Sequence, residues 1–432
     1  MFLLKKIIYN NQNLCLDCNY IKYCSPTTVF LKITSKCMLN CNFCSQGIAG
    51  NCEMDINKAK YLLKKLKKEN VLRIFYTGGE PFLYSHFKEL LEYGHSLGLC
   101  QLVITNGFLL NTNKVSSFLK YVNGISISVH GREETHNKIV NNQKSYEKIV
   151  EGIDKLKKEY PRIALDICYT ATPDNTNFKD ISSVAELCKK NKIPLNITRM
   201  YNIGKAKEII NDFGYIDRLV SIVEKLIQKK YDINIGHCLV QCNVRQRIPN
   251  SFCMAGIDFC FIDINGDIKI CGNSLEVIGN AFHDVFKKVW KNNKKKLCKR
   301  LKRLPLCCKN CENINTCLGG CKTEISIKNI PLNDSLAISI VLKKWNVIKD
   351  KKFDIKIGGI KKIRFNQYLI IGKESAIVNR NVINILTKIT VEKTLKENLL
   401  VINKSFNEFE LKSLFVLLYN NGFIMEKAKR GI

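Results

Sequence analysis

The sequence has no run of 18 apolar residues and only 8 prolines among its 432 residues. Without such a run, no helix is expected to span a membrane. Hydrophobic residues make up 46% and charged residues 25%, which excludes disordered, collagen-like and low-complexity chains. The opening residues MFLLKK hold too short an apolar patch, in the wrong order, for a signal peptide. We therefore expect a cytoplasmic protein of two or three domains.

Acidic residues are scarce: Asp and Glu number 38 against 69 Lys and Arg, for a formal net charge of +31. Such an excess suggests nucleic acid, anionic membranes or acidic peptides as partners. Only 12 of the 69 are Arg, however, and the chain is crowded with Ile and Asn, as a compositionally biased genome produces. The charge therefore limits the kinds of partner without choosing among them.

Cysteine is plentiful, with 21 residues, of which 16 fall into groups. In a reducing compartment, cysteines at fixed short spacings predict metal ligands rather than disulfides. The remaining five are interpreted as small apolar side chains, namely Cys52, Cys100, Cys168, Cys188 and Cys298.

A strand followed by a helix recurs six times between residue 28 and about residue 229. The predicted strands are 29–34, 71–76, 101–105, 124–129, 163–169 and 195–199, and the predicted helices lie near 56–69, 85–97, 113–121, 146–159, 178–190 and 216–229. This alternation predicts an α/β fold with a parallel sheet and crossover helices. Six units are too few for an eight-stranded barrel, so we predict a partial (β/α)6 TIM-like barrel with its chemistry at the carboxyl ends of the strands.

The first cysteine group, Cys37, Cys41 and Cys44, follows the first predicted strand directly. Three thiolates at this spacing can converge on one inorganic core, and a four-iron cube with three protein ligands keeps one iron open. A structural zinc site without a nearby fourth ligand is the alternative. The position after a barrel strand favours an active site.

The second predicted strand leads into Thr77-Gly78-Gly79-Glu80-Pro81. Two glycines at a strand end let the backbone approach a ligand closely, and the carboxylate can accept from an ammonium group. Taken alone, this segment predicts only a turn. Its place one strand after the cysteine group makes it a specific indication of a ligand-binding turn.

With these two motifs, residues 28–220 resemble the radical S-adenosylmethionine (SAM) enzymes. Phe43 before the last cysteine fits the family's loop, and weaker echoes are Ile104-Thr105-Asn106-Gly107 and the segment from Ile125 to Gly131. The resemblance implies that Cys37, Cys41 and Cys44 hold a [4Fe–4S] cluster whose open iron chelates SAM. Reductive cleavage of SAM would then yield a 5′-deoxyadenosyl radical that removes a substrate hydrogen.

The same resemblance implies the residues that bind SAM. The turn of Gly78, Gly79 and Glu80, closed by Pro81, would meet the methionine ammonium group. The backbone near Phe43 would lie against the adenine, and Ser128 is a weaker candidate for the ribose.

A second cysteine group occupies residues 253–321 with the spacing Cys-X12-Gly-X4-Cys, a gap, and Cys-X2-Cys-X5-Cys-X3-Cys. A two-zinc ribbon is one interpretation. The spacing is also similar to the SPASM extension of radical SAM enzymes, which carries auxiliary iron–sulfur clusters. That resemblance implies a first auxiliary [4Fe–4S] cluster on Cys253, Cys260, Cys271 and Cys321, and three ligands of a second on Cys308, Cys311 and Cys317.

The sequence departs from the SPASM pattern in two places. No cysteine follows Cys321, so the second auxiliary cluster is full, open-sited or absent; substitutes for its missing ligand are Asp334, Cys307, Cys298, Cys238 and Cys242. Gly272 stands where sulfatase-maturing relatives carry an aspartate that serves as base, which disfavours that reaction.

Two further stretches of the sequence each allow two interpretations. Cys15, Cys18 and Cys24 repeat the spacing of the second group, and either bind metal or are reduced thiols on an exposed arm. Between Lys287 and Arg303 there are 10 basic residues and no acidic one. That stretch is either a solvated helix face or a docking surface for an acidic peptide.

The tail lacks cysteine and reads as paired strands (363–371 and 375–379) with helices at 380–389 and 407–420. It weakly resembles the winged-helix domains that recognise leader peptides by adding them to a sheet edge, and an unrelated small α+β domain is the alternative. The predicted domains are an N-terminal arm (1–27), a radical SAM core (28–235), a SPASM domain (236–335) and a small C-terminal domain (345–432).

These observations predict a radical SAM enzyme that modifies a peptide or protein, for example by a thioether cross-link. The expected cofactors are the radical [4Fe–4S] cluster, SAM and one or two auxiliary clusters. The expected partners are a substrate with a leader peptide and an electron donor such as flavodoxin or ferredoxin, without membrane or nucleic acid. Alternatives are radical chemistry on a small-molecule precursor, or a nucleic-acid-binding regulator that uses metal structurally.

Overall fold

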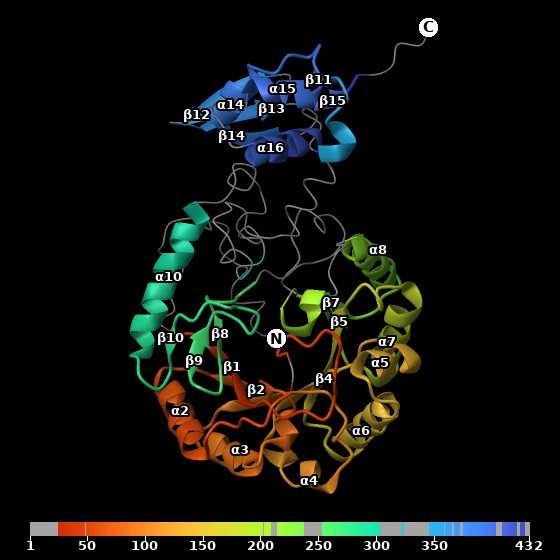
Figure 1. Cartoon of the computed structure of the whole chain (residues 1–432), viewed down its shortest axis with the longest axis vertical. Helices are drawn as coiled ribbons and strands as arrows, with labels where there is room; N and C mark the ends of the chain where they lie inside the picture. The colour runs from red at the N-terminus through yellow and green to blue at the C-terminus, as the bar shows by residue number, and fades with distance from the viewer. Residues whose placement is uncertain are drawn as a thin grey trace. The chain divides into compact units, whose positions relative to one another are not determined.

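The computed structural model divides into two compact units, Met1–Lys299 and Arg300–Ile432 (Figure 1). It describes residues 25–47, 49–201, 203–208, 214–236, 253–302, 321, 323, 345–357, 359–364, 367–371, 375–402, 408–420 and 424–427. Within these residues no helix is long and apolar enough to cross a membrane.

In its described part, the first unit is built on one ten-stranded sheet with the order β10-β9-β8-β1-β2-β3-β4-β5-β6-β7. Its parallel strands are β1 (Thr28–Thr34), β2 (Arg73–Gly78), β3 (Cys100–Thr105), β4 (Gly124–Ser128), β5 (Ala164–Ala171), β6 (Leu195–Arg199) and β7 (Ile233–Ile235). Each pairs in parallel with the next, for example Val29 with Ile74 and Ile167 with Leu195. The predicted α/β fold with a partial barrel is confirmed.

Helices between the strands cover the outer side of this sheet (Figure 1). They are α2 (Ile56–Lys68), α3 (Phe87–Ser96), α4 (Asn113–Ser116), α5 (Glu133–Val140), α6 (Ser145–Glu159), α7 (Phe178–Asn191) and α8 (Gly214–Gln228), with the 3-10 turns η2 (Pro81–Leu83), η3 (Leu119–Tyr121) and η4 (Gly204–Glu208). In α2, Ala59, Leu62, Leu63 and Leu66 are buried, as the helical spacing of apolar residues requires.

Some boundaries differ from the sequence prediction. The helix expected at 113–121 is two short pieces, because the hydroxyls of Ser116 and Ser117 donate to the carbonyls of Thr112 and Lys114 and compete with helix propagation. The helix α5 and the strand β7 were not predicted at all. Both are short, and α5 has a mixed polar sequence that gives little periodic signal.

The cysteine-rich region, where elements could not be assigned from sequence, extends the same sheet. Strand β8 (Phe259–Ile262) pairs in parallel with β1, and β9 (Asp267–Lys269) and β10 (Gly279–Asn280) continue antiparallel. The long helix α10 (Phe286–Lys302) follows.

The second unit contains a three-stranded antiparallel sheet of β12 (Gly359–Arg364), β13 (Gln367–Ile371) and β14 (Ser375–Asn379), and a small pair of β11 (Phe353–Ile355) with β15 (Ile424–Glu426). The helices named in its described part are α14 (Arg380–Leu386), α15 (Leu395–Ile402) and α16 (Glu408–Asn420). Buried residues such as Trp345, Phe415 and Leu399 form its core. The single strand predicted at 363–371 is wrong, because β12 ends at Arg364 and β13 begins at Gln367.

Candidate active site

The loop that carries Cys37, Cys41 and Cys44 leaves the carboxyl end of β1 and is fastened to α5. Leu39 is buried against Ile139 and Val140 of that helix. The backbone amides of Asn40 and Asn42 donate to the carbonyls of Val140 and Ile139 at 3.2 and 3.1 Å. The last carbonyls of α5, which have no partner within the helix, thus hold the loop.

The other end of the loop is fixed by η4. The amide of Lys205 donates to the carbonyl of Cys44 at 3.1 Å. Gly204 has φ +59°, and a Cβ there would lie 2.3 Å from the oxygen of Cys44, so only glycine allows this approach. Phe43 packs against Met200 and Ala206 on the same side. Two separate elements therefore set the position of the three cysteines.

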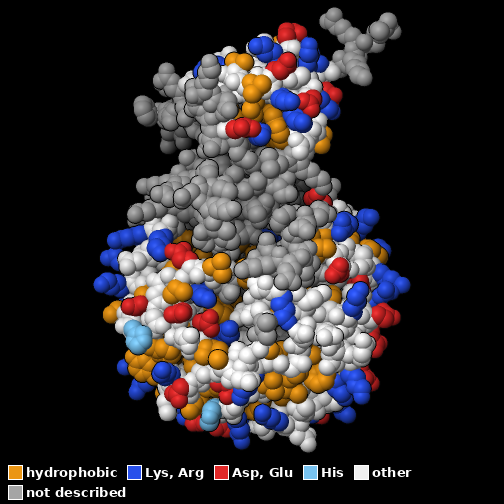
Figure 2. Space-filling view, in the orientation of Figure 1, with side chains coloured by type: hydrophobic (Ala, Val, Ile, Leu, Met, Phe, Trp, Pro, Cys, Tyr) orange, Lys and Arg blue, Asp and Glu red, His pale blue; other side chains and the backbone are white. Residues whose placement is uncertain are grey.

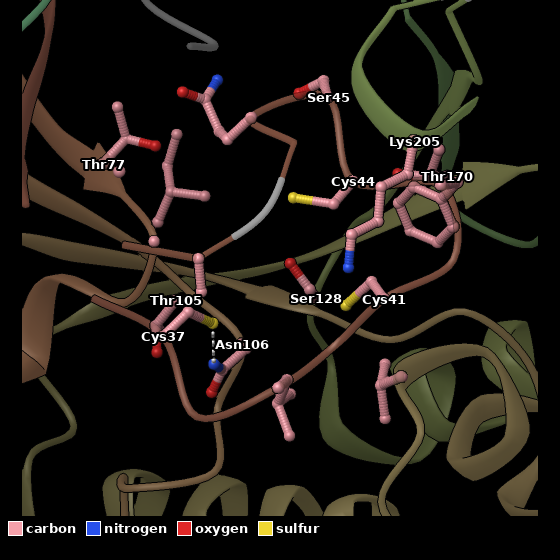
Figure 3. A pocket seen from close by; sticks show the side chains of 18 of the residues that line it. Cys37, Cys41, Cys44, Ser45, Thr77, Thr105, Asn106, Ser128, Thr170 and Lys205 are labelled. Carbon is pink, nitrogen blue, oxygen red and sulfur yellow. Dashed lines mark hydrogen bonds between the residues drawn. The ribbon is translucent and has the colours of Figure 1, made fainter. Parts of the chain in front are cut away.

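All three cysteines line one pocket of about 230 Å³ at the carboxyl ends of the strands (Figure 3). Each neighbouring strand or its following loop contributes to the wall: Lys32 and Ser35 from β1, Thr77, Gly78 and Gly79 from β2, Ile104, Thr105 and Asn106 from β3, Ser128 and His130 from β4, and Thr170 from β5. This is the end of the barrel at which the parallel topology collects functional side chains.

The thiols of the loop influence one another. Burial, together with the neighbouring Cys44 and Cys37, raises the pKa of Cys41 to about 12. Burial also raises the pKa of Cys37, against the Asn106 amide, whose Nδ2 lies 3.7 Å from its Sγ. In Figure 3 the side chain of Lys205 extends toward Cys41, and its charge lowers the pKa of that thiol. Three clustered thiols of this kind are stable as thiolates when cations bind them.

The fit to an iron–sulfur cluster follows from this donor set. Within the described residues, no three His, Cys, Asp or Glu side chains converge closely enough to hold one metal ion. Ligands of a four-iron core bind different irons and need no such convergence. The three cysteines face a common pocket from one short loop, and this arrangement fits the predicted [4Fe–4S] cluster.

Gly78 and Gly79 pass so close to the cysteine loop that side chains are excluded. A Cβ on Gly78, where φ is +146°, would lie 2.1 Å from the oxygen of Thr34, and one on Gly79 would lie 2.2 Å from the oxygen of Lys36. The amides of Gly79 and Glu80 donate to these carbonyls at 2.9 and 2.7 Å. The turn and the loop are thereby joined into one pocket wall.

Glu80 and Pro81 lie behind that wall, not on it. Glu80 is fully buried, and its carboxylate accepts from the amide of Asn106 at 2.8 Å, the hydroxyl of Thr105 at 2.9 Å and the amide of Phe82 at 3.1 Å. Burial raises its pKa to about 7 against these donors. Pro81 begins the buried turn η2. The structure gives Glu80 a positioning contact, and its direct contact with SAM stays a prediction.

Phe43 and Ser128 both line the pocket, together with two histidines that the sequence interpretation passed over. The ring of Phe43 meets the edge of His130 at 4.8 Å between centroids. Nδ1 of His130 accepts from the amide of Thr170, and the amide of His130 donates to Nδ1 of His136. Burial lowers the pKa of both rings, to about 4 for His136, so both are neutral at pH 7.

Asn106 lines the pocket, and its position in the sequence carried a signal for that place. It lies in the Ile104–Gly107 segment that resembles the family. Its side-chain amide contacts the sulfur of Cys37 and, at 3.3 Å, the sulfur of Met38. Lys205 and His136 had no such signal, because they come from elements outside the strand-end pattern.

The second cysteine group is only partly within the described residues. Cys308, Cys311 and Cys317 lie outside them, as do Cys15, Cys18, Cys24 and Asp334. Cys253 and Cys260 are buried and Cys271 is half-buried in the first unit, and Cys321 is buried in the second. Cys260 is in β8, paired with Val29, and burial raises the pKa of its thiol. The ligand assignments of this group stay predictions.

Comparison with known proteins agrees with the geometry. Residues 31–188 match the model of the radical SAM superfamily. The mycofactocin maturase MftC of Mycobacterium tuberculosis is 24% identical over 324 residues, which cover 72% of this chain and 81% of the relative. The AdoMet-dependent heme synthase of Oleidesulfovibrio alaskensis is 25% identical over 323 residues, covering 68% and 81%.

Among solved structures, Streptococcus suis SuiB bound to the precursor peptide SuiA is similar, with a TM-score of 0.61. The two chains are 19% identical over 72% of this chain and 76% of SuiB, which shows a shared fold. The family match covers the cysteine loop, the Gly-Gly turn and the strands that carry them. This chain therefore contains a radical SAM domain.

Proposed function

We propose that the chain is a peptide maturase, which cleaves SAM reductively and removes a hydrogen from a peptide or protein substrate. The observation that carries the proposal is the pocket in which Cys37, Cys41 and Cys44 face the Gly78–Gly79 turn. A [4Fe–4S] cluster bound there supplies the electron that breaks the sulfonium bond of SAM. The named relatives support a peptide substrate, since one is a maturase and one was solved with a precursor peptide.

The residues of the chain itself position SAM and exclude water. The buried carboxylate of Glu80 holds the backbone of Asn106 and Phe82, and so fixes the turn against which the methionine end of SAM would lie. The ring of Phe43 is held by His130, and Ser128 offers a hydroxyl on the same wall. Neutral histidines at this wall add no charge that would oppose the sulfonium group.

The proposal extends to the other domains predicted above, with the core at 28–235, a SPASM domain at 236–335 and one or two auxiliary clusters. The C-terminal domain, 345–432, would recognise a leader peptide. Among the described residues its three-stranded sheet has the order β12-β13-β14, so β12 and β14 are edge strands to which an extended peptide could add. A cytoplasmic location and a flavodoxin- or ferredoxin-type electron donor belong to the same proposal.

A small-molecule substrate is the second candidate, favoured by the similarity to AdoMet-dependent heme synthases. One experiment separates the two. Reconstituted enzyme is incubated anaerobically with SAM and dithionite, once with short peptides encoded beside its gene and once with iron-coproporphyrin. We expect 5′-deoxyadenosine in both and a mass change in a peptide only. Conversion of the porphyrin without any peptide product would overturn the peptide proposal.

A further inference from the structure

The helix α10 has one apolar face that is buried and one basic face that is exposed. Phe286, Val289, Trp290, Asn293 and Leu297 are buried, at the spacing of a single helical stripe. On the opposite side are exposed lysines, which we call the α10 ridge: Lys287, Lys288, Lys291, Lys295 and Lys296. Figure 2 shows Lys and Arg side chains along the edge of the first unit where α10 lies.

The ridge is largely uncompensated. Lys287 pairs with Glu69 at 3.8 Å at one end, and Lys296 pairs with Glu276 at 2.6 Å at the other. Lys288, Lys291 and Lys295 have no ion pair within the described residues. Neither α10 nor α2 contains an acidic residue.

The basic surface continues onto α2. The Nζ of Lys65 donates to the carbonyls of Ala281 and Asp284 at 2.7 and 2.8 Å, which brings the end of α2 against the start of α10. Lys64 and Lys68, near that end of α2, are exposed. Charge of one sign spread over two adjoining helices attracts a partner of the opposite sign.

Exposed apolar side chains flank the ridge. Val285, directly before α10, is 66% exposed, and Leu275 and Val277 are 63% and 47% exposed. The ion pair of Glu276 with Lys296 holds the segment of Leu275 and Val277 beside the helix. An exposed basic helix face with an apolar margin suits a globular partner, because apolar contacts add affinity where charges steer the encounter.

The buried side of α10 rests on the segment that follows Cys253. The Nδ2 of Asn293 donates to the carbonyl of Gly256 at 2.7 Å, and a Cβ on Gly256 would contact Ile270 at 3.1 Å. A partner on the ridge is thus separated from this segment by about one helix diameter, roughly 10–12 Å.

We propose that the α10 ridge is the docking surface for a small acidic one-electron redox protein of the flavodoxin type. The inference rests on the proposed function, and on an iron–sulfur centre held through Cys253. In the transfer, the flavin hydroquinone of the partner loses one electron and becomes the semiquinone. The electron would pass across α10 to a centre held there, and no bond would form or break.

The test compares the wild type with a charge-reversal variant, K288E/K291E/K295E. The matched control is K158E/K179E/K190E, which alters the net charge equally through exposed lysines of α6 and α7 on the opposite flank (Figure 1). Binding of oxidised flavodoxin is measured by titration at low and high salt. We expect at least about tenfold weaker binding for the ridge variant only, and a loss of salt dependence.

The second readout is 5′-deoxyadenosine formation driven by reduced flavodoxin or by dithionite. In the ridge variant, the rate of 5′-deoxyadenosine formation should fall about tenfold when flavodoxin is the reductant and should not change with dithionite. Equal flavodoxin binding and turnover in both variants would overturn the inference. So would ridge-dependent binding of a Glu-rich decapeptide with flavodoxin binding unchanged. Absence of dithionite-driven SAM cleavage in the wild type would instead refute the proposed function.

Discussion

The two cysteine groups of the first unit differ in how their thiols are placed. Cys37, Cys41 and Cys44 lie on a loop after a strand, are partly exposed, and share one pocket. Cys260 lies within a strand, is fully buried, and has a pKa raised by burial alone, whereas the pKa of Cys41 is raised also by its neighbours. Membership of a cysteine group therefore does not by itself imply access to a cofactor.

The difference arises from sheet topology. A loop at the carboxyl end of β1 faces the end of the barrel, where the loops of adjacent strands meet. Strand β8 has a neighbouring strand on each side. Within it, Cys260 pairs with Val29 of β1, and both side chains are fully buried. The following predictions test or sharpen this contrast, from the largest expected effect to the smallest.

Replacing Cys37, Cys41 and Cys44 together by Ala should abolish 5′-deoxyadenosine formation under anaerobic reducing conditions. Auxiliary-cluster absorbance should persist, because its predicted ligands come from residues 253–321. Cys52→Ala, an exposed cysteine outside the groups, is the control and should retain activity. SAM cleavage by the triple variant would refute the assignment of the loop.

In the second group, Cys253→Ala and Cys271→Ala should each remove about four irons per chain while the radical cluster remains. Cys188→Ala, a buried cysteine of α7, is the control. Cys260→Val keeps an apolar side chain of similar size in β8, and the ligand prediction requires the same iron loss. An unchanged iron content would assign Cys260 to the core of the sheet instead.

Glu80→Gln should destabilise the pocket wall by about 3 kcal/mol, because an amide NH2 would face backbone and hydroxyl donors that the carboxylate now accepts. Chemical denaturation measures the loss, and SAM affinity should fall about tenfold as the turn shifts. Glu89→Gln, at an exposed ion pair with Lys60, is the control. Full stability and affinity would show that Glu80 is dispensable.

His136 should make the enzyme acid-sensitive. Burial lowers its folded pKa from the usual 6.5 to about 4, so its stabilising contribution is present above pH 6.5 and is lost as the pH falls toward 4. Between pH 7 and 5 the free energy of unfolding should drop by about 2 kcal/mol from this residue. In the His136→Gln variant, the free energy of unfolding should not show this loss between pH 7 and 5. An identical pH dependence in the variant would contradict the assignment.

Periodicity was sufficient for most of the barrel, since predicted strands such as 195–199 and helices such as 178–190 agree closely with β6 and α7. It failed at β7 and α5, which are too short for a repeating pattern, and at the tail strand broken after Arg364. For the site, local motifs identified the cysteine loop and the glycine turn. They did not identify the partners that come from α5 and η4.

The sequence by itself determined the class of chemistry, because three closely spaced cysteines and a Gly-Gly turn are local features with local chemical meaning. Only the tertiary structure decided that Glu80 turns its carboxylate toward Asn106, that His136 and Lys205 join the pocket, and that α10 presents lysines on one side and covers the Cys253 segment on the other. These depend on contacts between residues far apart in the chain, and burial and charge at such contacts follow from packing, which no local pattern encodes.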